Sequence, residues 1–220
     1  PSALHAWSWT SAVSLDSIAW NAQSVIPNAP PAAFTSSPYP ALNLGTNEYA
    51  EIEQGLELGG VDVSFAAWMY AGASIATGAR FFTFGTGMQS GSAVPMNVYL
   101  EYTGSDGIEF GFGEVTSGGT SIFNTWLCAN ALTTGTYHHV VITISNTGSV
   151  IVYVDNAVKT CTSSINPSLG SVGLPYGNYS TSFFGKTTQT STSPDVSMQL
   201  QSFAVYYEVL TAAAVNTLCT

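Results

Sequence analysis

Two carboxylates occupy alternate positions of one short predicted strand. Glu51 and Glu53 lie within residues 49–53, where the two-residue period of a strand places both side chains on one face. A pair of carboxylates is what glycoside hydrolysis requires. Position 55 is Gly, and no other pair of acids has this spacing on a predicted strand. We therefore interpret the segment as a solvated edge strand rather than the catalytic strand of a glycosidase.

His138 and His139 are adjacent in a chain with three histidines. Neighbouring strand residues point to opposite faces, so the two rings cannot serve one metal ion or act as one base. His138 is in phase with Val140 and Ile142, which predicts a hydrogen-bonded core residue. The sequence shows no Ser/His/Asp set and no glycine-rich phosphate loop. Both histidines are therefore predicted to be structural.

Tyr176 and Tyr179 belong to a Gly- and Pro-containing segment, residues 173–179, that is predicted to be an exposed loop. Their rings are the candidate glycan-stacking groups of the chain. Aromatic residues of a β-sandwich more often belong to its core. The same choice between core and sugar contact applies to four further aromatic residues: Trp68, Tyr70, Tyr102 and Trp126.

Cysteine and asparagine positions bear on the compartment. Cys128 and Cys161 are the favoured disulfide pair, Cys219 is then free or paired with another chain, and three reduced cysteines are the alternative. Asn178, in Asn-Tyr-Ser, is the predicted N-glycosylation residue. The chain begins at a residue other than Met, which predicts that a signal peptide or pro-segment has been removed. These features predict an extracellular or cell-surface protein.

The charge balance excludes several partners. The chain has 220 residues, 3 basic against 13 acidic side chains, and a net charge of −10. So few cations cannot neutralise nucleic-acid phosphates or an anionic membrane surface. No apolar run reaches the ~20 residues of a membrane helix, so the protein is predicted not to be membrane-embedded. A hydrophobic content of 45% excludes a disordered chain.

Hydrophobic alternation divides most of the chain into short strands. Residues 61–70 and 108–112 alternate, and Glu109 and Gly111 are predicted to face away from the core. A hairpin is predicted from 137–145 and 150–154. Further strands are predicted at 49–53, 80–86, 98–102, 157–161, 183–186 and 197–207. The one predicted helix is 210–218, with Thr211 as its N-cap. The pattern predicts an all-β fold, an antiparallel β-sandwich (jelly roll) with one short C-terminal helix.

Residues 1–45 differ from the rest in composition. They are rich in Pro, Ala and Ser and contain Trp7, Trp9 and Trp20. Three indoles require burial. The segment is therefore predicted to be an extended lead-in that packs on the domain, or on a neighbour, with the domain itself at 46–220.

Several motifs follow one another in a familiar order. Residues 137–143 read YHHVVIT, and residues 148–156 read GSVIVYVDN. Residues 63–70 read VSFAAWMY, and 200–218 read LQSFAVYYEVLTAAAVNTL. These stretches resemble the strands and closing helix of laminin-G-like, concanavalin A-like jelly rolls. The resemblance implies that fold, in a superfamily that includes lectins, adhesion modules, glycoside hydrolases and polysaccharide lyases, so fold alone leaves the function open.

The resemblance also implies a possible calcium site, because related modules hold Ca²⁺ at a loop rim. Four acids lie in or beside predicted loops: Asp106, Glu114, Asp155 and Asp195. They lack EF-hand spacing, and Gln199 and Gln201 stand where the closing strand of the family often carries acids. We therefore predict no cofactor, with Ca²⁺ as the alternative.

The surface composition supports one functional hypothesis over two others. Charged residues make up 7% of the chain, against ~25–35% of an ordinary soluble surface. Such a surface favours packing against copies of the chain, against other extracellular proteins, or beneath a glycan coat. The predicted function is a non-enzymatic structural or adhesive module of a filament, sheath or matrix. The alternative is a carbohydrate-binding, lectin-like domain with glycan partners, and a glycoside hydrolase or lyase is third.

Overall fold

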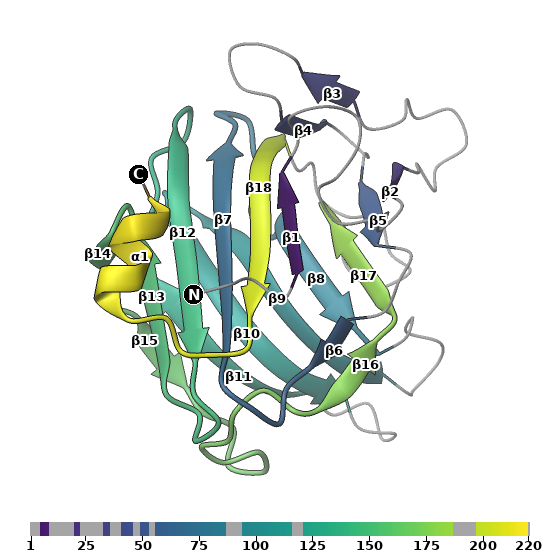
Figure 1. Ribbon diagram of the computed structural model, residues 1–220, viewed down its shortest axis with the longest axis vertical. Helices are drawn as coiled ribbons and strands as arrows, with labels where there is room; N and C mark the ends of the chain where they lie inside the picture. Colours follow the sequence, from purple (N-terminus) through teal and green to yellow (C-terminus); the bar gives the residue numbers. More distant parts are fainter. Residues whose placement is uncertain are drawn as a thin grey trace.

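In the part of the chain that it describes, the computed structural model has two stacked antiparallel sheets, a separate two-stranded pair and one short helix (Figure 1). The described residues are 5–8, 20–22, 33–35, 41–45, 49–52, 56–86, 94–115, 121–186 and 197–219. The predicted all-β jelly roll with a C-terminal helix is confirmed. Among the described residues, no helix is long and apolar enough to span a bilayer.

The first sheet has eight strands, and β7 and β12 lie near its middle. Its order is β14 (Ala157–Val158), β13 (Val150–Val154), β12 (Tyr137–Ile144), β7 (Val63–Ala71), β18 (Met198–Tyr206), β4 (Ala41–Leu44) and β3 (Ala33–Thr35), with β1 (His5–Ser8) paired to β18. The predicted hairpin is therefore present as β12 and β13, in the register Ile144 to Val150.

The second sheet also has eight strands. Its order is β15 (Thr162–Ser164), β11 (Ser121–Cys128), β10 (Gly107–Val115), β9 (Val94–Gly104), β8 (Arg80–Gly85), β17 (Thr181–Phe184), β5 (Ala50–Ile52) and β2 (Trp20–Ala22). A separate pair joins β16 (Gly177–Tyr179) to β6 (Leu56–Leu58). β5 lies between β17 and β2, so the prediction of an edge strand around Glu51 is wrong. Glu53 lies outside the described residues.

Strand periodicity fills the space between the sheets with aromatic rings. Phe65 of β7 lies at 5.4 Å from Phe82 and 6.4 Å from Phe110, measured between ring centroids, and these rings come from the opposite sheet. Ile108 and Phe112 are also buried in this core. Their register sends the intervening residues of β10 to the outer face, as the alternation predicted.

Helix α1 (Ala212–Leu218) packs on the outer face of the first sheet. Thr211 caps it by accepting a hydrogen bond from the Ala214 N–H at 3.2 Å. Its buried residue Val215 joins a small apolar cluster with Val141 and Tyr153. The predicted N-cap and helix are therefore present.

Residues 1–45 contribute strands to both sheets where they are described. β1, β3 and β4 belong to the first sheet, and β2 belongs to the second. Trp9 lies outside the described residues. Farther along the chain, Cys128 and Cys161 form a disulfide between the end of β11 and the segment before β15, and Cys219 is free.

Candidate functional site

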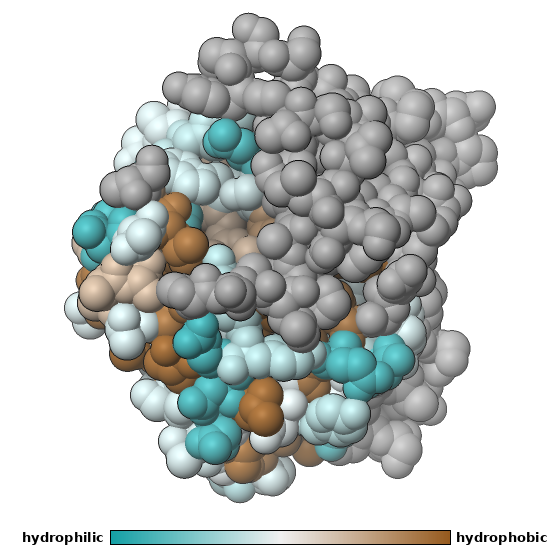
Figure 2. Space-filling view, in the orientation of Figure 1, coloured by the Kyte–Doolittle hydropathy of each residue, from teal (hydrophilic) through white to brown (hydrophobic). Residues whose placement is uncertain are grey.

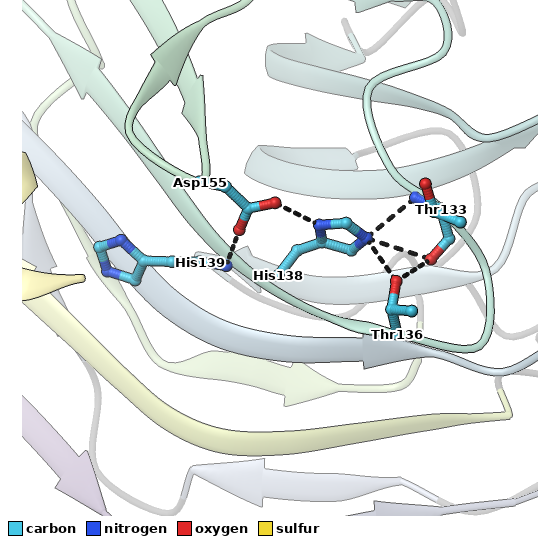
Figure 3. A network of polar contacts seen from close by, with 5 residues as sticks. All are labelled: Thr133, Thr136, His138, His139 and Asp155. Atoms are coloured by element: carbon cyan, nitrogen blue, oxygen red, sulfur yellow. Dashed lines mark hydrogen bonds and ion pairs between the residues drawn. The ribbon is translucent and has the colours of Figure 1, made fainter. Parts of the chain in front are cut away.

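A polar network surrounds His138 at the start of β12 (Figure 3). Its Nδ1 lies 2.6 Å from Asp155 Oδ2, while Asp155 Oδ1 accepts a hydrogen bond from the His139 backbone N–H at 2.9 Å. Its Nε2 accepts a hydrogen bond from the Thr133 N–H at 2.9 Å and lies 2.9 Å from Thr136 Oγ1. The imidazole is buried. His138 is thus the hydrogen-bonded core residue that the sequence predicted.

Thr136, His138 and Asp155 place a hydroxyl, an imidazole and a carboxylate in line, the arrangement of a nucleophilic triad. Sequence reasoning did not find this set. With its Nδ1 proton directed at Asp155, the ring has one lone pair left, on Nε2. The Thr133 N–H takes that lone pair, and Thr136 Oγ1 donates to the Thr133 carbonyl at 2.7 Å. The network therefore fastens residues 133–136 to β12 and leaves no free base for the hydroxyl.

His139 points to the other face of the strand. Its ring is buried and lies 5.2 Å from the Trp68 ring. Within the described part of the chain its Nδ1 has no hydrogen-bond partner. Burial lowers the pKa of this imidazole, against the opposing effect of the Asp155 charge. His139 is therefore a neutral packing residue.

Of the four predicted calcium candidates, the three that the structure describes do not assemble. Asp106, in the turn after β9, accepts the Thr134 N–H through Oδ1 at 3.2 Å, and both oxygens of Asp155 already have partners. Glu114 stands at the far end of β10, about 25 Å from Asp106 at the rise of a strand. Asp195 lies outside the described residues. No group of three or more potential ligands among the described residues is placed to hold a metal.

A charged cluster lies on the outer face of the second sheet. Arg80 Nη2 is 2.9 Å from Glu101 Oε2, and its guanidinium carbon lies 3.5 Å from the centroid of the Tyr99 ring. Tyr99 Oη donates to Glu109 at 2.8 Å. Glu101 and Glu109 face each other across β9 and β10. Burial raises the pKa of Glu101, and Arg80 opposes that shift. Sequence reasoning missed this carboxylate pair because its members are neighbours across two strands rather than along one. These contacts join Arg80, Tyr99, Glu101 and Glu109 to one another.

An open hollow of about 260 Å³ lies where β6, β16 and the chain leaving β18 meet. Its lining residues are Glu57, Gly59, Gly60, Val61, Tyr176 and Tyr207. Its volume is near the lower limit, roughly 300 Å³, of small-molecule sites. Tyr176 is 68% exposed, Val61 45% and Tyr207 38%, so apolar surface faces solvent here.

Two glycines shape the floor of the hollow. Gly59 has φ +83°, and a Cβ there would lie 2.1 Å from the Pro175 carbonyl oxygen. Gly60 donates its N–H to the Leu174 carbonyl at 3.0 Å, and a Cβ on Gly60 would lie 3.3 Å from the Cβ of Tyr176. The absence of side chains at both positions lets the segment carrying Tyr176 lie against the backbone after β6.

Glu57 organises the polar side of the hollow. Its Oε2 accepts a hydrogen bond from Tyr176 Oη at 2.7 Å, and its Oε1 accepts one from Asn178 Nδ2 at 3.4 Å. The hydrogen bond to Glu57 raises the pKa of Tyr176. Burial, and then the Glu57 charge, raise the pKa of Tyr207. Both phenols are therefore neutral at pH 7, beside an anionic carboxylate.

The candidate stacking residues separate by burial. Tyr176 lines the hollow, as its predicted exposure requires. Tyr179 is fully buried and donates its hydroxyl to the Pro175 carbonyl at 2.9 Å, so its predicted stacking role is wrong. The predicted loop contains β16, whose alternation turns Tyr179 inward and Asn178 outward. Tyr102 and Trp126 are core residues. Asn178 is exposed, and its glycosylation stays a prediction.

A family model described as the concanavalin A-like lectin/glucanases superfamily matches residues 44–216. The chain belongs to this superfamily. The match includes every described residue of the hollow and of the His138 network. Comparison with curated protein sequences gives no match.

Solved structures of the same fold include carbohydrate-binding proteins. The receptor-binding domain of botulinum neurotoxin type G is 12% identical, with a TM-score of 0.63 over 100% of this chain and 51% of that one. Domain 4 of AbnA, an extracellular arabinanase of Geobacillus stearothermophilus in complex with arabinotriose, is 12% identical, with a TM-score of 0.61 over 98% and 97%. The CBM40 of the Ruminococcus gnavus IT-sialidase, bound to α2,3-sialyllactose, is 12% identical, with a TM-score of 0.55 over 76% of this chain and 96% of that one.

These identities show a shared fold and no more. The chain spans about half the length of the toxin binding domain it matches.

Proposed function

We propose that the protein is an extracellular, non-enzymatic carbohydrate-binding module and that the hollow is its glycan site. The observation that carries the proposal is the exposed ring of Tyr176, which a 2.7 Å hydrogen bond fixes beside the Glu57 carboxylate. A fixed aromatic face packs on the C–H face of a sugar, and a neighbouring acceptor binds its hydroxyl groups. Relatives of this fold that hold arabinotriose or sialyllactose support the proposal.

Binding without cleavage fits the composition of the hollow. Its lining residues include one carboxylate, Glu57. Glycoside hydrolysis by the usual route uses two, separated by ~5–9.5 Å. Incubation with any bound oligosaccharide should therefore release no new reducing ends, and sustained release would contradict a purely binding role.

The test is glycan binding by wild type and two variants of Tyr176. An array of oligosaccharides identifies binders, and calorimetry measures their affinity. Tyr176→Ala should weaken binding about tenfold or more, because it removes the apolar contact at the centre of the site. Tyr176→Phe keeps the ring and loses the bond to Glu57, so its loss should be smaller. Val158→Ala is the control, because Val158 lies on the exposed strand β14 and does not line the hollow.

Ser180→Ala belongs in the same experiment. The substitution removes the sequon and leaves the Asn178 amide beside Glu57. A glycan on Asn178 would start at the atom that contacts Glu57 and would obstruct the hollow. Silence of the array with Ser180→Ala protein, or affinity that Tyr176→Ala leaves unchanged, would overturn the proposed site.

Self-packing in a filament, sheath or matrix is a second candidate function. β14 and β15 end their sheets, all their residues are exposed, and Val158 is 62% exposed. Leu127, which pairs with Thr162 of β15, is 40% exposed, and Ile165, which follows β15, is 37% exposed. On the coloured part of the face in Figure 2, polar and apolar residues are interspersed, so this face offers no continuous apolar patch. Contacts between copies would therefore use the exposed edge strands, whose free backbone groups can pair with another chain. Sedimentation that shows a concentration-independent monomer would contradict this role.

A further inference from the structure

Among the described residues that line the hollow, Glu57 alone carries a full charge, and that charge is negative. We propose that it selects uncharged sugars with two neighbouring hydroxyl groups and excludes sugars that carry a carboxylate. This inference rests on the proposed function and adds the class of ligand.

Glu57 retains acceptor capacity for such a ligand. A carboxylate offers about four lone-pair positions on its two oxygens. Tyr176 Oη uses one on Oε2, and Asn178 Nδ2 uses one on Oε1 through a long contact of 3.4 Å. Each oxygen therefore keeps a position for one sugar hydroxyl. Two neighbouring hydroxyls of a pyranose or furanose match the spacing of the two oxygens of one carboxylate.

No lining residue of the hollow carries a positive charge to offset Glu57. The chain has three basic residues, and each is placed elsewhere. Arg80 pairs with Glu101 on the outer face of the second sheet. Lys186 lies over the rings of Tyr49 and Phe183. Lys159 follows β14, at the opposite edge of the sandwich from β6 and β16 (Figure 1).

The two tyrosines do not supply a charge either. Tyr176 and Tyr207 are phenols whose raised pKa values keep them neutral. Their hydroxyls donate and accept hydrogen bonds and so suit sugar hydroxyl groups. A ligand carboxylate within about 4 Å of Glu57 would instead meet a like charge without compensation, which at an exposed site weakens binding by about tenfold.

Related structures make the expected selectivity informative. One carbohydrate-binding relative is bound to α2,3-sialyllactose, and the binding domain of botulinum neurotoxin serotype D is in complex with N-acetylneuraminic acid. Both ligands are acidic sugars. The present chain shares that fold but places the Glu57 carboxylate in its hollow, so we expect it to bind uncharged sugars instead.

Matched pairs of probes test the selectivity. Lactose is compared with 3′-sialyllactose, and methyl-esterified tri-galacturonic acid with the de-esterified form, using Ser180→Ala protein and immobilised sugars. Arabinotriose serves as a further neutral probe. The neutral member of a pair should bind about tenfold more tightly at low salt, and the gap should narrow at high salt because the repulsion is screened.

Glu57→Gln is the decisive variant, because it keeps an acceptor oxygen and removes the charge. The variant should bind neutral sugars severalfold more weakly and reduce the gap within each pair to about twofold. Carboxylated sugars that bind wild type as tightly as neutral ones, with binding still lost in Tyr176→Ala, would overturn the selectivity and leave the proposed function standing. Absence of binding to every probe, or binding that Tyr176→Ala does not affect, would overturn both.

Discussion

Two regions of the molecule each contain a carboxylate among hydrogen-bond donors. One is the stretch closed by the disulfide, residues 128–161, and the other is the hollow beside β6 and β16. In the closed stretch, both oxygens of Asp155 are taken by His138 and by the backbone of His139. In the hollow, Glu57 is exposed, and its two partners, Tyr176 and Asn178, are themselves exposed side chains. Asp155 is exposed as well, but its partners are a buried ring and the backbone of β12, so it serves the fold, whereas Glu57 holds two exposed side chains at the hollow.

The difference shows how a structural site is distinguished from a binding site when the residue types are similar. The Thr136–His138–Asp155 set resembles catalytic machinery, yet the Thr133 N–H saturates its base. The hollow has no catalytic set, but it presents a fixed ring and a carboxylate to solvent. Both carboxylates are exposed, so the exposure of their partners is the better indicator of function here: His138 is buried, whereas Tyr176 and Asn178 are exposed. Separate changes in the two regions should affect stability in one and binding in the other.

The largest expected effect is on the disulfide. Replacing Cys128 and Cys161 with Ala opens a loop with a sequence separation of 33. The chain-entropy model predicts that the free energy of unfolding falls by about 3–4 kcal/mol, which urea denaturation measures. Glycan affinity of the protein that remains folded should not change, because the hollow lies outside this loop. A loss of affinity in fully folded variant protein would show that the two regions are coupled.

The closed stretch was also the region best predicted from sequence. The disulfide pair, the β12–β13 hairpin and the core position of His138 all follow from local alternation, turn residues and cysteine count. Strand β11 was missed, although its Trp126 is buried in the core. Its sequence from Ser121 to Cys128 alternates weakly, and its pairing partners lie elsewhere in the chain.

The hollow was harder to predict, because residues far apart in sequence form it. Tyr176 was identified as a candidate from its local Gly and Pro neighbours, but Glu57 and Tyr207 were not. Glu57 lies on β6, a strand of three residues that is too short to give a period. The pairing of β6 with β16 brings Glu57 opposite Asn178, and it also explains why Tyr179 is buried. Local patterns do not report such long-range pairings.

Gly59→Ala should damage the hollow through the backbone. At φ +83° an alanine is strained, and its Cβ would overlap the Pro175 carbonyl oxygen. We expect the free energy of unfolding to fall by about 2–3 kcal/mol and glycan affinity to fall with it. Gly135→Ala is the matched control, because φ there is +84° and a Cβ would have no neighbour within 4 Å. Equal losses in both variants would mean that the contact with Pro175 contributes nothing.

Asp155→Ala tests the other carboxylate. It removes the acceptor for His138 Nδ1 and for the His139 N–H, and Asp155 itself has φ 51°. We expect a loss of about 2 kcal/mol in the free energy of unfolding, without a change in glycan affinity. Asp155→Asn tolerates the same backbone conformation and keeps one acceptor, so its loss should be about half. Glycan binding that falls in the alanine variant under folding conditions would assign Asp155 a role in the site.

The smallest effect concerns acidification and His139. Burial holds the pKa of this imidazole below its ordinary value of 6.5, so the unfolded chain binds a proton that the folded protein does not. The resulting stability is fully present above pH 6.5 and is lost as the pH falls through the lower pKa of the folded state. His139→Gln should flatten this part of the pH profile of unfolding, measured with urea between about pH 7.5 and about pH 5.5. An unchanged profile would mean that His139 is solvated. Glycan affinity should keep the same pH dependence in both proteins, because the ring lies outside the hollow.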